Sequence, residues 1–157
     1  MSTVERADAP APAWFEAISS SPVLDELLGH LSAGRDASAR GLAGSSGTLL
    51  AAALSRRLER PLLLVAAHLD EASDIADELA DLGLEGRLFP ALEVLPGESG
   101  VSLDLLAARL GLVRDLHFGH TPSIVVAPIA ALMQAVPGPT RLAAMLRDAG
   151  CGLVVVL

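Results

Sequence analysis

The chain contains no lysine and no tyrosine, and it has a single cysteine. Its 11 basic residues are all arginine, against 19 acidic residues, which gives a formal net charge of −8. Phosphate contacts with nucleic acids depend on Lys and Arg side chains, so this acidic balance predicts no direct nucleic-acid binding. Because Cys151 is alone, an intrachain disulfide is impossible, which fits a reducing cytoplasm.

Long apolar runs and targeting signals are also lacking. No stretch reaches the roughly 18 apolar residues of a membrane span, and the N-terminus lacks the basic and apolar regions of a signal peptide. We therefore expect a soluble cytoplasmic protein without membrane contact. Hydrophobic residues make up 52% of the chain but aromatics only 3%. Small aliphatic side chains must fill the core, which suits helices packed on a buried parallel sheet.

Apolar patterning predicts alternating helices and strands along most of the chain. Helices are predicted at 22–31, 48–58, 70–82, 102–118, 128–134 and 140–149, and strands at 39–43, 62–67, 87–89, 123–127 and 152–157. This order predicts an α/β fold with a parallel sheet, helices on both faces and right-handed crossovers. We expect a disordered leader at 1–20, a single α/β domain at 21–137, and a helix and strand at 138–157 that would begin a following domain.

The segment from Gly41 to Thr48 is similar to the P-loop pattern G-x-x-x-x-G-K-[ST]. Gly41 matches the first glycine and Thr48 the terminal hydroxyl, but Ser46 replaces the second glycine and Gly47 replaces the lysine. That lysine contacts the β- and γ-phosphates during phosphoryl transfer, and loss of one such donor slows a reaction about 100- to 1,000-fold. The sequence predicts a degenerate, P-loop NTPase-like fold that does not hydrolyse ATP.

Two interpretations of this loop remain open. Its residues could hold an anion weakly through backbone amides at the helix start, or the loop could only turn the chain from strand to helix. The candidate binding residues are Gly41, Gly44, Ser45, Ser46, Gly47 and Thr48. A magnesium carboxylate is doubtful, because Asp70 is more simply a helix N-cap than a ligand. We expect no catalytic residue and no cofactor. The alternative function is a small P-loop-like nucleotide-binding protein or enzyme that uses Thr48 and the backbone of residues 41–47.

Other reactive side chains are isolated along the sequence. His117 and His120 have H-x-x-H spacing, but no nearby Cys or acidic pair completes a metal site, so no metal is expected. Cys151 has no evident neighbouring base and is interpreted as a structural thiol.

A long, apolar and proline-bounded loop extends from Phe89 to Glu98. Such a loop either meets another domain or covers its own core, and the sequence does not decide between these. The interface candidates are Phe89, Pro90, Glu93, Leu95 and Pro96.

Several motifs follow one another in a particular order. They are the loop 41–48, Arg60–Val65, Asp70–Ala72, Leu88–Glu98, Ala108–Leu110 and Ile124–Gln134. The most specific are FP-x-x-E-x-LP-x-E at 89–98 and AP-x-x-ALMQ at 127–134. Over about residues 24–137 this series resembles the N-terminal domain of bacterial transcription-repair coupling factors, the Mfd family.

The resemblance implies a UvrB-like module with a degenerate nucleotide loop, serving as a scaffold in transcription-coupled nucleotide excision repair. In that family a separate motor further along a longer chain hydrolyses ATP, translocates on DNA and displaces stalled RNA polymerase, and a neighbouring domain recruits UvrA. The expected partners are therefore the other domains of the full-length protein, with UvrA and RNA polymerase contacted mostly by parts absent here. Residues 140–157 depart from the family pattern, so we expect a truncated segment.

Overall fold

The fold is taken from a computed structural model of the chain, which describes residues 13–92 and 100–141. The chain divides into two compact units, Met1–Arg60 and Pro61–Leu157. The boundary between them falls inside the predicted 21–137 domain. Predictions for residues 1–12, 93–99 and 142–157 lie outside the described residues.

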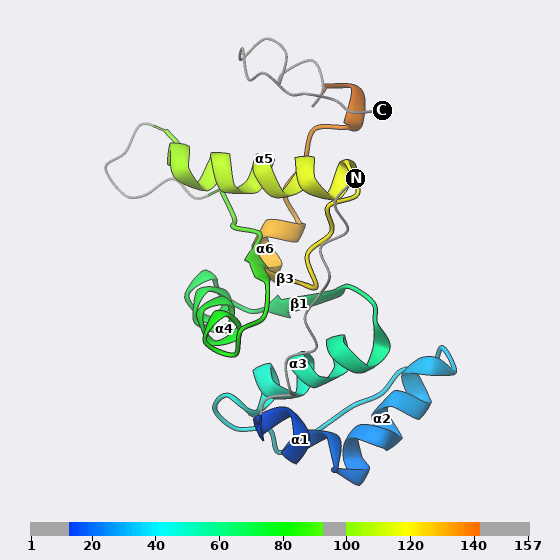
Figure 1. The fold of residues 1–157 in the computed structure, drawn as a ribbon. Coiled ribbons are helices and arrows are strands. Elements are labelled where there is room, and N and C mark those ends of the chain that lie inside the picture. The colour runs from blue at the N-terminus through cyan, green and yellow to red at the C-terminus, as the bar shows by residue number, and fades with distance from the viewer. Residues whose placement is uncertain (1–12, 93–99, 142–157) are drawn as a thin grey trace. The chain divides into compact units, whose positions relative to one another are not determined.

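The first unit contains three helices, α1 (Ala13–Ser19), α2 (Pro22–Ser32) and α3 (Ser46–Leu58), and both α1 and α2 contact α3 (Figure 1). The predicted disordered leader is wrong for its last part, because 13–19 are helical. The Arg56 guanidinium of α3 lies over the rings of Trp14 and Phe15, at 5.7 Å and 5.4 Å from their centroids. Cation–π contacts of this kind stabilise α1 against α3.

Helix α2 begins where the sequence predicts it. Ser21 occupies the N-cap position with extended backbone, although its side chain makes no capping hydrogen bond, and Pro22 is in the first turn. Proline suits that position because its missing N–H would have no intrahelical partner. Leu24 is buried, with 1% of its surface exposed. On the exposed side of the pair, Arg57 of α3 forms an ion pair of 3.3 Å with Asp25.

The strand predicted at 39–43 is not formed. Residues 35–43 adopt neither helix nor strand, and Leu42 within them is 49% exposed. Gly41 and Gly44 have φ of +79° and +55°. Positive φ values interrupt an extended conformation, so a strand does not continue through Gly41, and the chain turns at residues 44–45 before α3 begins.

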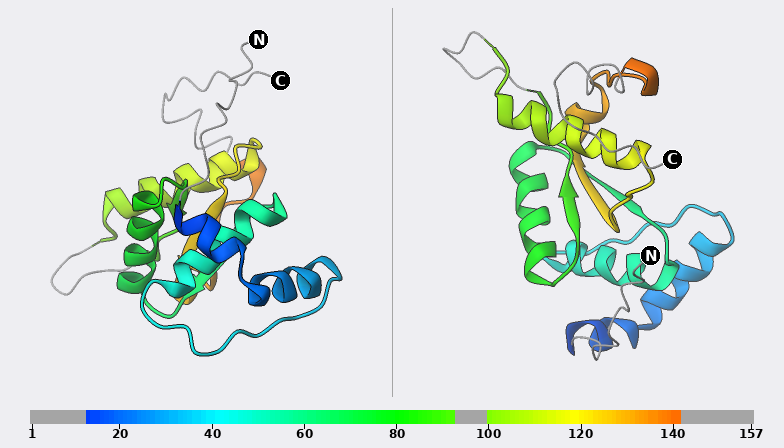
Figure 2. Two further views of the ribbon diagram at one scale, coloured as in Figure 1. Left: turned by 60° about the horizontal axis from the view of Figure 1, so that its bottom comes forward. Right: turned by 45° about the horizontal axis from the view of Figure 1, so that its top comes forward.

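The second unit contains a parallel sheet of three strands, β1 (Leu62–Ala66), β2 (Gly86–Leu88) and β3 (Ile124–Pro128). The spatial order is β1-β3-β2, with β3 between the others (Figure 2). All five residues of β3 are buried. This arrangement confirms the predicted α/β class and the parallel sheet.

Helix α4 (Leu69–Asp81) connects β1 to β2 and packs against the sheet. A Cβ atom built on Gly86 would lie 2.8 Å from Leu79 Cδ1 and 3.0 Å from Leu79 Cβ. Leu79 is fully buried, so α4 lies close to the backbone of β2 and requires glycine there. Gly86 is in register with Ile124, which therefore faces α4.

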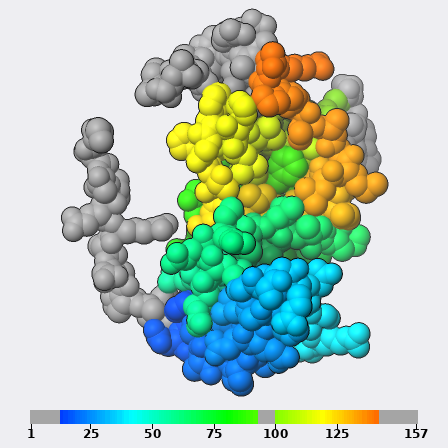
Figure 3. All heavy atoms as spheres, turned by 90° about the vertical axis from the view of Figure 1, so that its right-hand side faces the viewer, coloured from blue at the N-terminus to red at the C-terminus, as the bar shows by residue number. Residues whose placement is uncertain are grey.

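Helix α5 (Leu103–His117) and the short α6 (Ile129–Leu132) cover the other face. Side chains alternate between the faces of a strand, so Val125 and Ala127 point away from α4. They form one cluster with Phe89, Ala91, Leu112 of α5 and Ala131 of α6. Figure 3 shows yellow atoms from the end of α5 beside the orange atoms that follow β3. Helices on both faces were predicted.

None of the helices in the described ranges is long and apolar enough to cross a bilayer.

Candidate functional site

The loop from Gly41 to Thr48 is closed by its own side chains. The Ser46 hydroxyl accepts a hydrogen bond from the Ala43 N–H and donates one to the Ala43 carbonyl, both at 2.8 Å. The Ser46 N–H also donates to Ala43 O at 3.3 Å. Ser45 is the N-cap of α3, without a side-chain capping bond. These contacts form a tight turn into the helix.

Thr48 lies in the first turn of α3 and is 6% exposed. In a working P-loop this hydroxyl binds Mg²⁺ beside the phosphates. Here the Thr48 side chain is buried, and residues 35–43 before the loop do not form a strand. The loop geometry therefore matches a helix-start turn more closely than a phosphate-binding loop.

Asp70 does not cap α4 as predicted, because the helix begins one residue before it and His68 is the N-cap residue. The neighbouring Glu71 reaches back over the helix start: its Oε2 atom accepts a hydrogen bond of 3.0 Å from the Ala67 N–H. In a capping box the carboxylate of the third helical residue bonds to the N-cap amide, whereas Glu71 bonds to the amide one residue earlier, before His68. Asp70 itself is exposed in the first turn.

The two predicted loop histidines lie at the end of α5. His117 is the last residue of the helix, where its ring contacts Phe118, and the His120 N–H donates to Asp115 O at 2.8 Å. Within the described residues, no group of three or more His, Cys, Asp or Glu side chains is placed to hold a metal ion.

Arg109 of α5 is the most unusual polar residue of the second unit, because it is a charged side chain with only 2% of its surface exposed. Its Nη1 atom donates to Pro90 O at 3.0 Å, and Nη2 donates to Ala131 O at 2.9 Å and to Gln134 O at 3.0 Å. Its guanidinium lies over the Phe89 ring, 4.1 Å from the centroid. One side chain thus connects α5 to two separate segments of chain.

Gln134 makes a second connection between the same two segments. Its Oε1 atom accepts from the Leu92 N–H at 2.8 Å, and its Nε2 atom donates to Leu92 O at 3.1 Å. Both backbone groups of Leu92 are therefore paired with a side-chain amide, as they would be with a neighbouring strand. We call Phe89, Pro90, Leu92, Arg109, Ala131 and Gln134 the Arg109 cluster.

The Arg109 cluster stabilises a buried cation with carbonyl oxygens and an aromatic face. Among the described residues, no carboxylate forms an ion pair with it. Desolvation lowers the pKa of Arg109, but guanidinium remains protonated under ordinary conditions. Its charge is therefore dispersed over three carbonyl dipoles and the Phe89 ring.

Two of the five interface candidates are not accessible for an interface. Phe89 is 8% exposed, and Pro90 is among the fully buried side chains. Both belong to the interior of the second unit, so at these positions the segment covers its own core, which was the alternative interpretation. Glu93, Leu95 and Pro96 lie outside the described residues.

The sequence contains the residues of the Arg109 cluster within its most specific motifs, but their spacing does not predict that they meet. Arg109, the FP segment and the ALMQ segment were all noticed as parts of one ordered series. Their contacts join positions 19 to 42 residues apart, so spacing gave no indication that they meet. An arginine in the middle of a helix with apolar neighbours was the only local indication of burial.

Comparison with known proteins supports the resemblance that the ordered motifs indicate. The chain is 37% identical over 101 residues to the transcription-repair-coupling factor of Bacillus subtilis (strain 168). The aligned region covers 62% of this chain but 8% of the relative, so the chain spans a small part of that protein's length. No family model matches the chain, and no solved structure matches it significantly. The resemblance expected from the motifs is thereby confirmed: this chain is similar to a segment of a transcription-repair-coupling factor.

Proposed function

We propose that this chain is a non-catalytic scaffold segment that acts in transcription-coupled DNA repair. The observation that carries the proposal is the 37% identity to a transcription-repair-coupling factor over 101 residues. The ordered motifs lie mainly in the second unit, where the FP and ALMQ segments converge on Arg109. Residues that carry the resemblance thus contact one another in the interior of the second unit, which agrees with a structural role.

The absence of catalysis is supported by the loop from Gly41 to Thr48. Glycine occupies the lysine position, so the charged donor for the β- and γ-phosphates is missing. The Ser46 hydroxyl is already bonded to Ala43 on both its donor and acceptor sides. We infer that the loop is a degenerate P-loop whose remaining role is to start α3.

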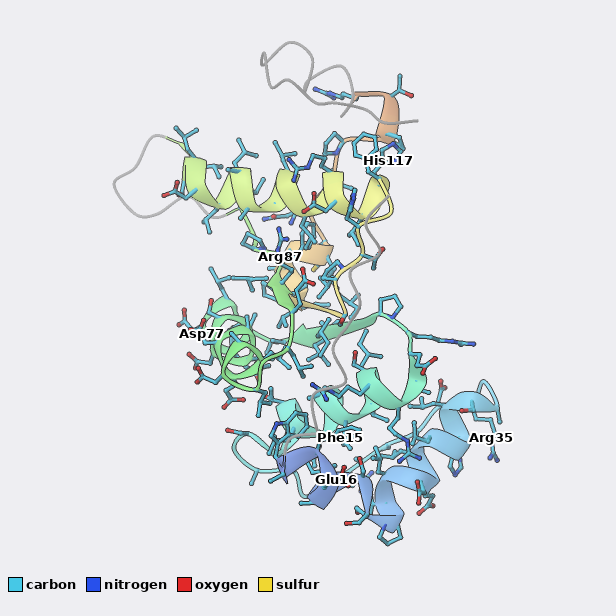
Figure 4. The ribbon with its side chains drawn as sticks, in the orientation of Figure 1. Phe15, Glu16, Arg35, Asp77, Arg87 and His117 are labelled. Atoms are coloured by element: carbon cyan, nitrogen blue, oxygen red, sulfur yellow. The ribbon has the colours of Figure 1, made fainter. Side chains whose placement is uncertain are left out.

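An acidic surface supports the expected lack of direct nucleic-acid binding. Asp70, Asp74, Asp77 and Asp81 are exposed on α4 at spacings that place them on one side of the helix. Asp77 lies on the outer side of α4 (Figure 4). Phosphates would be repelled from this surface, so we propose partners that are proteins: the other domains of a longer coupling factor, UvrA and RNA polymerase. A cytoplasmic location follows from this role.

The non-catalytic role is tested by measuring ATP hydrolysis by the purified chain with Mg²⁺. We expect no turnover above that of a buffer control, with or without DNA. A turnover of 1 to 10³ per second, as in ordinary enzymes, would contradict the proposal. A weak rate is assigned to this loop only if Thr48→Ala abolishes it and Thr48→Ser retains it. A contaminating ATPase would not respond to either substitution.

The scaffold role is tested by pull-down of UvrA, RNA polymerase and a coupling factor that lacks its matching N-terminal region. We expect capture of the truncated factor. Capture of none of the three, together with micromolar binding to double-stranded DNA at physiological salt, would refute it.

The second candidate is a small nucleotide-binding protein, favoured only by the match of Gly41 and Thr48 to the P-loop pattern. Calorimetry with ATP and Mg²⁺ separates it from the scaffold. Micromolar binding that is lost in Thr48→Ala and retained in Thr48→Ser would favour the nucleotide-binding protein. Absence of binding by the unmodified chain would favour the scaffold.

A further inference from the structure

The short helix α6 buries one side and exposes the other. Ala131 belongs to the core of the second unit, whereas Ile129, Leu132 and Met133 are 49%, 40% and 83% exposed. Residues three and four positions apart are neighbours on a helical turn, so these three large apolar side chains lie together on the outer side. We call Ile129, Leu132 and Met133 the α6 surface.

The backbone of the α6 surface is held from the inside. Arg109 donates hydrogen bonds to Ala131 O at 2.9 Å and to Gln134 O at 3.0 Å. These two carbonyl groups lie on either side of Leu132 and Met133 along the chain. A surface whose backbone is already fixed loses little conformational freedom when a partner binds.

Acidic side chains lie at the same edge of the sheet. Ala66 of β1 and Pro128 of β3 are in register, and neighbouring strands lie about 4.8 Å apart. Helix α4 begins three residues after Ala66, and α6 begins directly after Pro128, so the starts of the two helices are adjacent. Asp70 and Asp74 are exposed in the first two turns of α4.

The charge of the second unit decides what kind of partner the α6 surface fits. No ion pair in the described ranges includes Asp70 or Asp74. Most arginines of the described part of this unit are already paired or buried, namely Arg87, Arg109 and Arg114. The whole chain has a net charge of −8. A second copy, a nucleic acid or an anionic membrane would therefore be repelled, whereas a basic partner would be attracted.

We propose that the α6 surface, with Asp70 and Asp74 beside it, binds a basic amphipathic helix of a partner protein. The apolar side of that helix covers the α6 surface, and its Lys or Arg side chains pair with the two carboxylates. Amphipathic helices dock by apolar residues at i, i+3 and i+4 spacing. The inference rests on the proposed scaffold role and assigns to it a surface and a partner chemistry.

A synthetic peptide of leucine and lysine, arranged as an amphipathic helix, is the probe. Its binding to the whole chain is measured by fluorescence anisotropy, beside a peptide in which glutamate replaces every lysine. We expect the lysine peptide to bind at least about tenfold more tightly than the glutamate peptide, and more weakly as salt is raised. Absence of binding by the lysine peptide, or equal affinities of the two peptides, would overturn the proposal.

Leu132→Ser tests the apolar part of the surface. Its matched control is Leu116→Ser, because Leu116 is 42% exposed but lies in the last turn of α5, which returns the chain to the start of β3 at the opposite edge of the sheet. We expect Leu132→Ser to weaken probe binding at least about fivefold, and Leu116→Ser to change it by less than about twofold. Met133→Ser repeats the test at a more exposed position, where the fold is not at risk. Equal effects at Leu132 and Leu116, or no effect at Leu132 and Met133, would refute the α6 surface.

Asp70→Asn tests the charged part, and Asp81→Asn is its control. Both variants remove one negative charge from α4, but Asp81 is the last residue of the helix, about 16 Å from Asp70 at 1.5 Å per residue. We expect Asp70→Asn to weaken probe binding about two- to fivefold and to reduce its salt dependence, with little change in Asp81→Asn. Equal weakening by both variants would show that net charge alone attracts the probe, contrary to the proposal.

The scaffold role and the α6 surface can fail separately. If the truncated coupling factor is captured equally well by the unmodified chain, Leu132→Ser and Met133→Ser, the scaffold role stands and the α6 surface is refuted. If the probe binds with the expected pattern but the chain captures no coupling factor, the scaffold role fails and the surface stands. Shielding of the Met133 methyl group from a soluble paramagnetic chelate, in the chain alone, would also refute the surface, because another part of the chain would then cover it.

Discussion

The guanidinium carbon of Arg109 lies 4.1 Å from the centroid of the Phe89 ring, within the interior of the second unit. The same group donates hydrogen bonds to the carbonyl oxygens of Pro90, Ala131 and Gln134. A buried cation therefore connects the two segments that carry the resemblance most specifically. The contribution of Arg109 to the free energy of unfolding can be measured by substitution.

Arg109→Met is expected to lower the free energy of unfolding of the second unit by about 3–5 kcal/mol. Methionine fills much of the space but leaves three carbonyl groups without their donor, and each unpaired buried acceptor costs about 1–3 kcal/mol. Urea unfolding followed by far-UV circular dichroism, with hydrogen exchange of β3 amides, measures the change. A loss below about 1 kcal/mol would show that the Arg109 cluster is not a main source of stability.

Arg109→Lys separates the charge from the geometry. Lysine retains the cation but cannot present the planar fork that directs two nitrogens to different carbonyls. We expect a loss smaller than that of Arg109→Met but still above about 1 kcal/mol. Stability equal to that of the unmodified chain would show that charge alone is sufficient.

The charge of Arg109 should add no pH dependence near neutrality. Desolvation lowers its pKa in the folded state, so the unfolded chain binds more protons at pH values between the folded and unfolded pKa, and stability rises with pH in that range. Guanidinium is protonated in both states at neutral pH. Stability curves of the unmodified chain and Arg109→Met should therefore run parallel from about pH 6 to 9. Curves that diverge in this interval would contradict this explanation.

Local patterning predicted the second unit well because α4 has a helical apolar periodicity and β3 is a continuous apolar run. The helix predicted at 70–82 is found at Leu69–Asp81, and the strand predicted at 123–127 is found at Ile124–Pro128. The predicted strand at 39–43 failed because positive φ at Gly41 and Gly44 overrides a short apolar run. Glycine is the residue that most readily adopts positive φ, so Gly41 within the run was a sequence signal against a strand.

The sites were harder to predict than the elements, because they depend on contacts between distant residues. The loop at 41–48 was recognised from a contiguous pattern. The burial of Phe89 and Pro90 depends on Arg109 and Ala131, which come from two other elements. Asp70 was predicted to cap its helix, whereas the neighbouring Glu71 reaches the free amide of Ala67. The helix begins at Leu69, so Asp70 lies in the first turn and His68 is the N-cap residue.

Gly86→Ala is expected to destabilise the second unit by about 1–3 kcal/mol, as overpacking of a core does. The added methyl group would lie 2.8 Å from Leu79 Cδ1 and 3.0 Å from Leu79 Cβ. Because Leu79 is fully buried, it cannot move aside without displacing α4. Chemical unfolding measures the loss.

Gly111→Ala is the matched control for Gly86→Ala. Gly111 lies within α5, and a Cβ there would meet nothing within 4 Å. Alanine favours a helix over glycine by up to about 1 kcal/mol, so this variant should be as stable as the unmodified chain or more so. Equal losses in the two variants would show that the contact with Leu79 is not the cause.

In the first unit, Arg56 of α3 contacts the rings of Trp14 and Phe15 of α1. Arg56→Gln removes both cation–π contacts, each of about 0.5–1 kcal/mol at an exposed site. We expect faster hydrogen exchange of α1 amides and a red shift of the fluorescence of Trp14, the only tryptophan. Arg57→Gln, which removes only the exposed ion pair with Asp25, should leave both signals unchanged. If the two variants behave alike, loss of charge on α3, and not contact with the aromatic rings, would explain the effect.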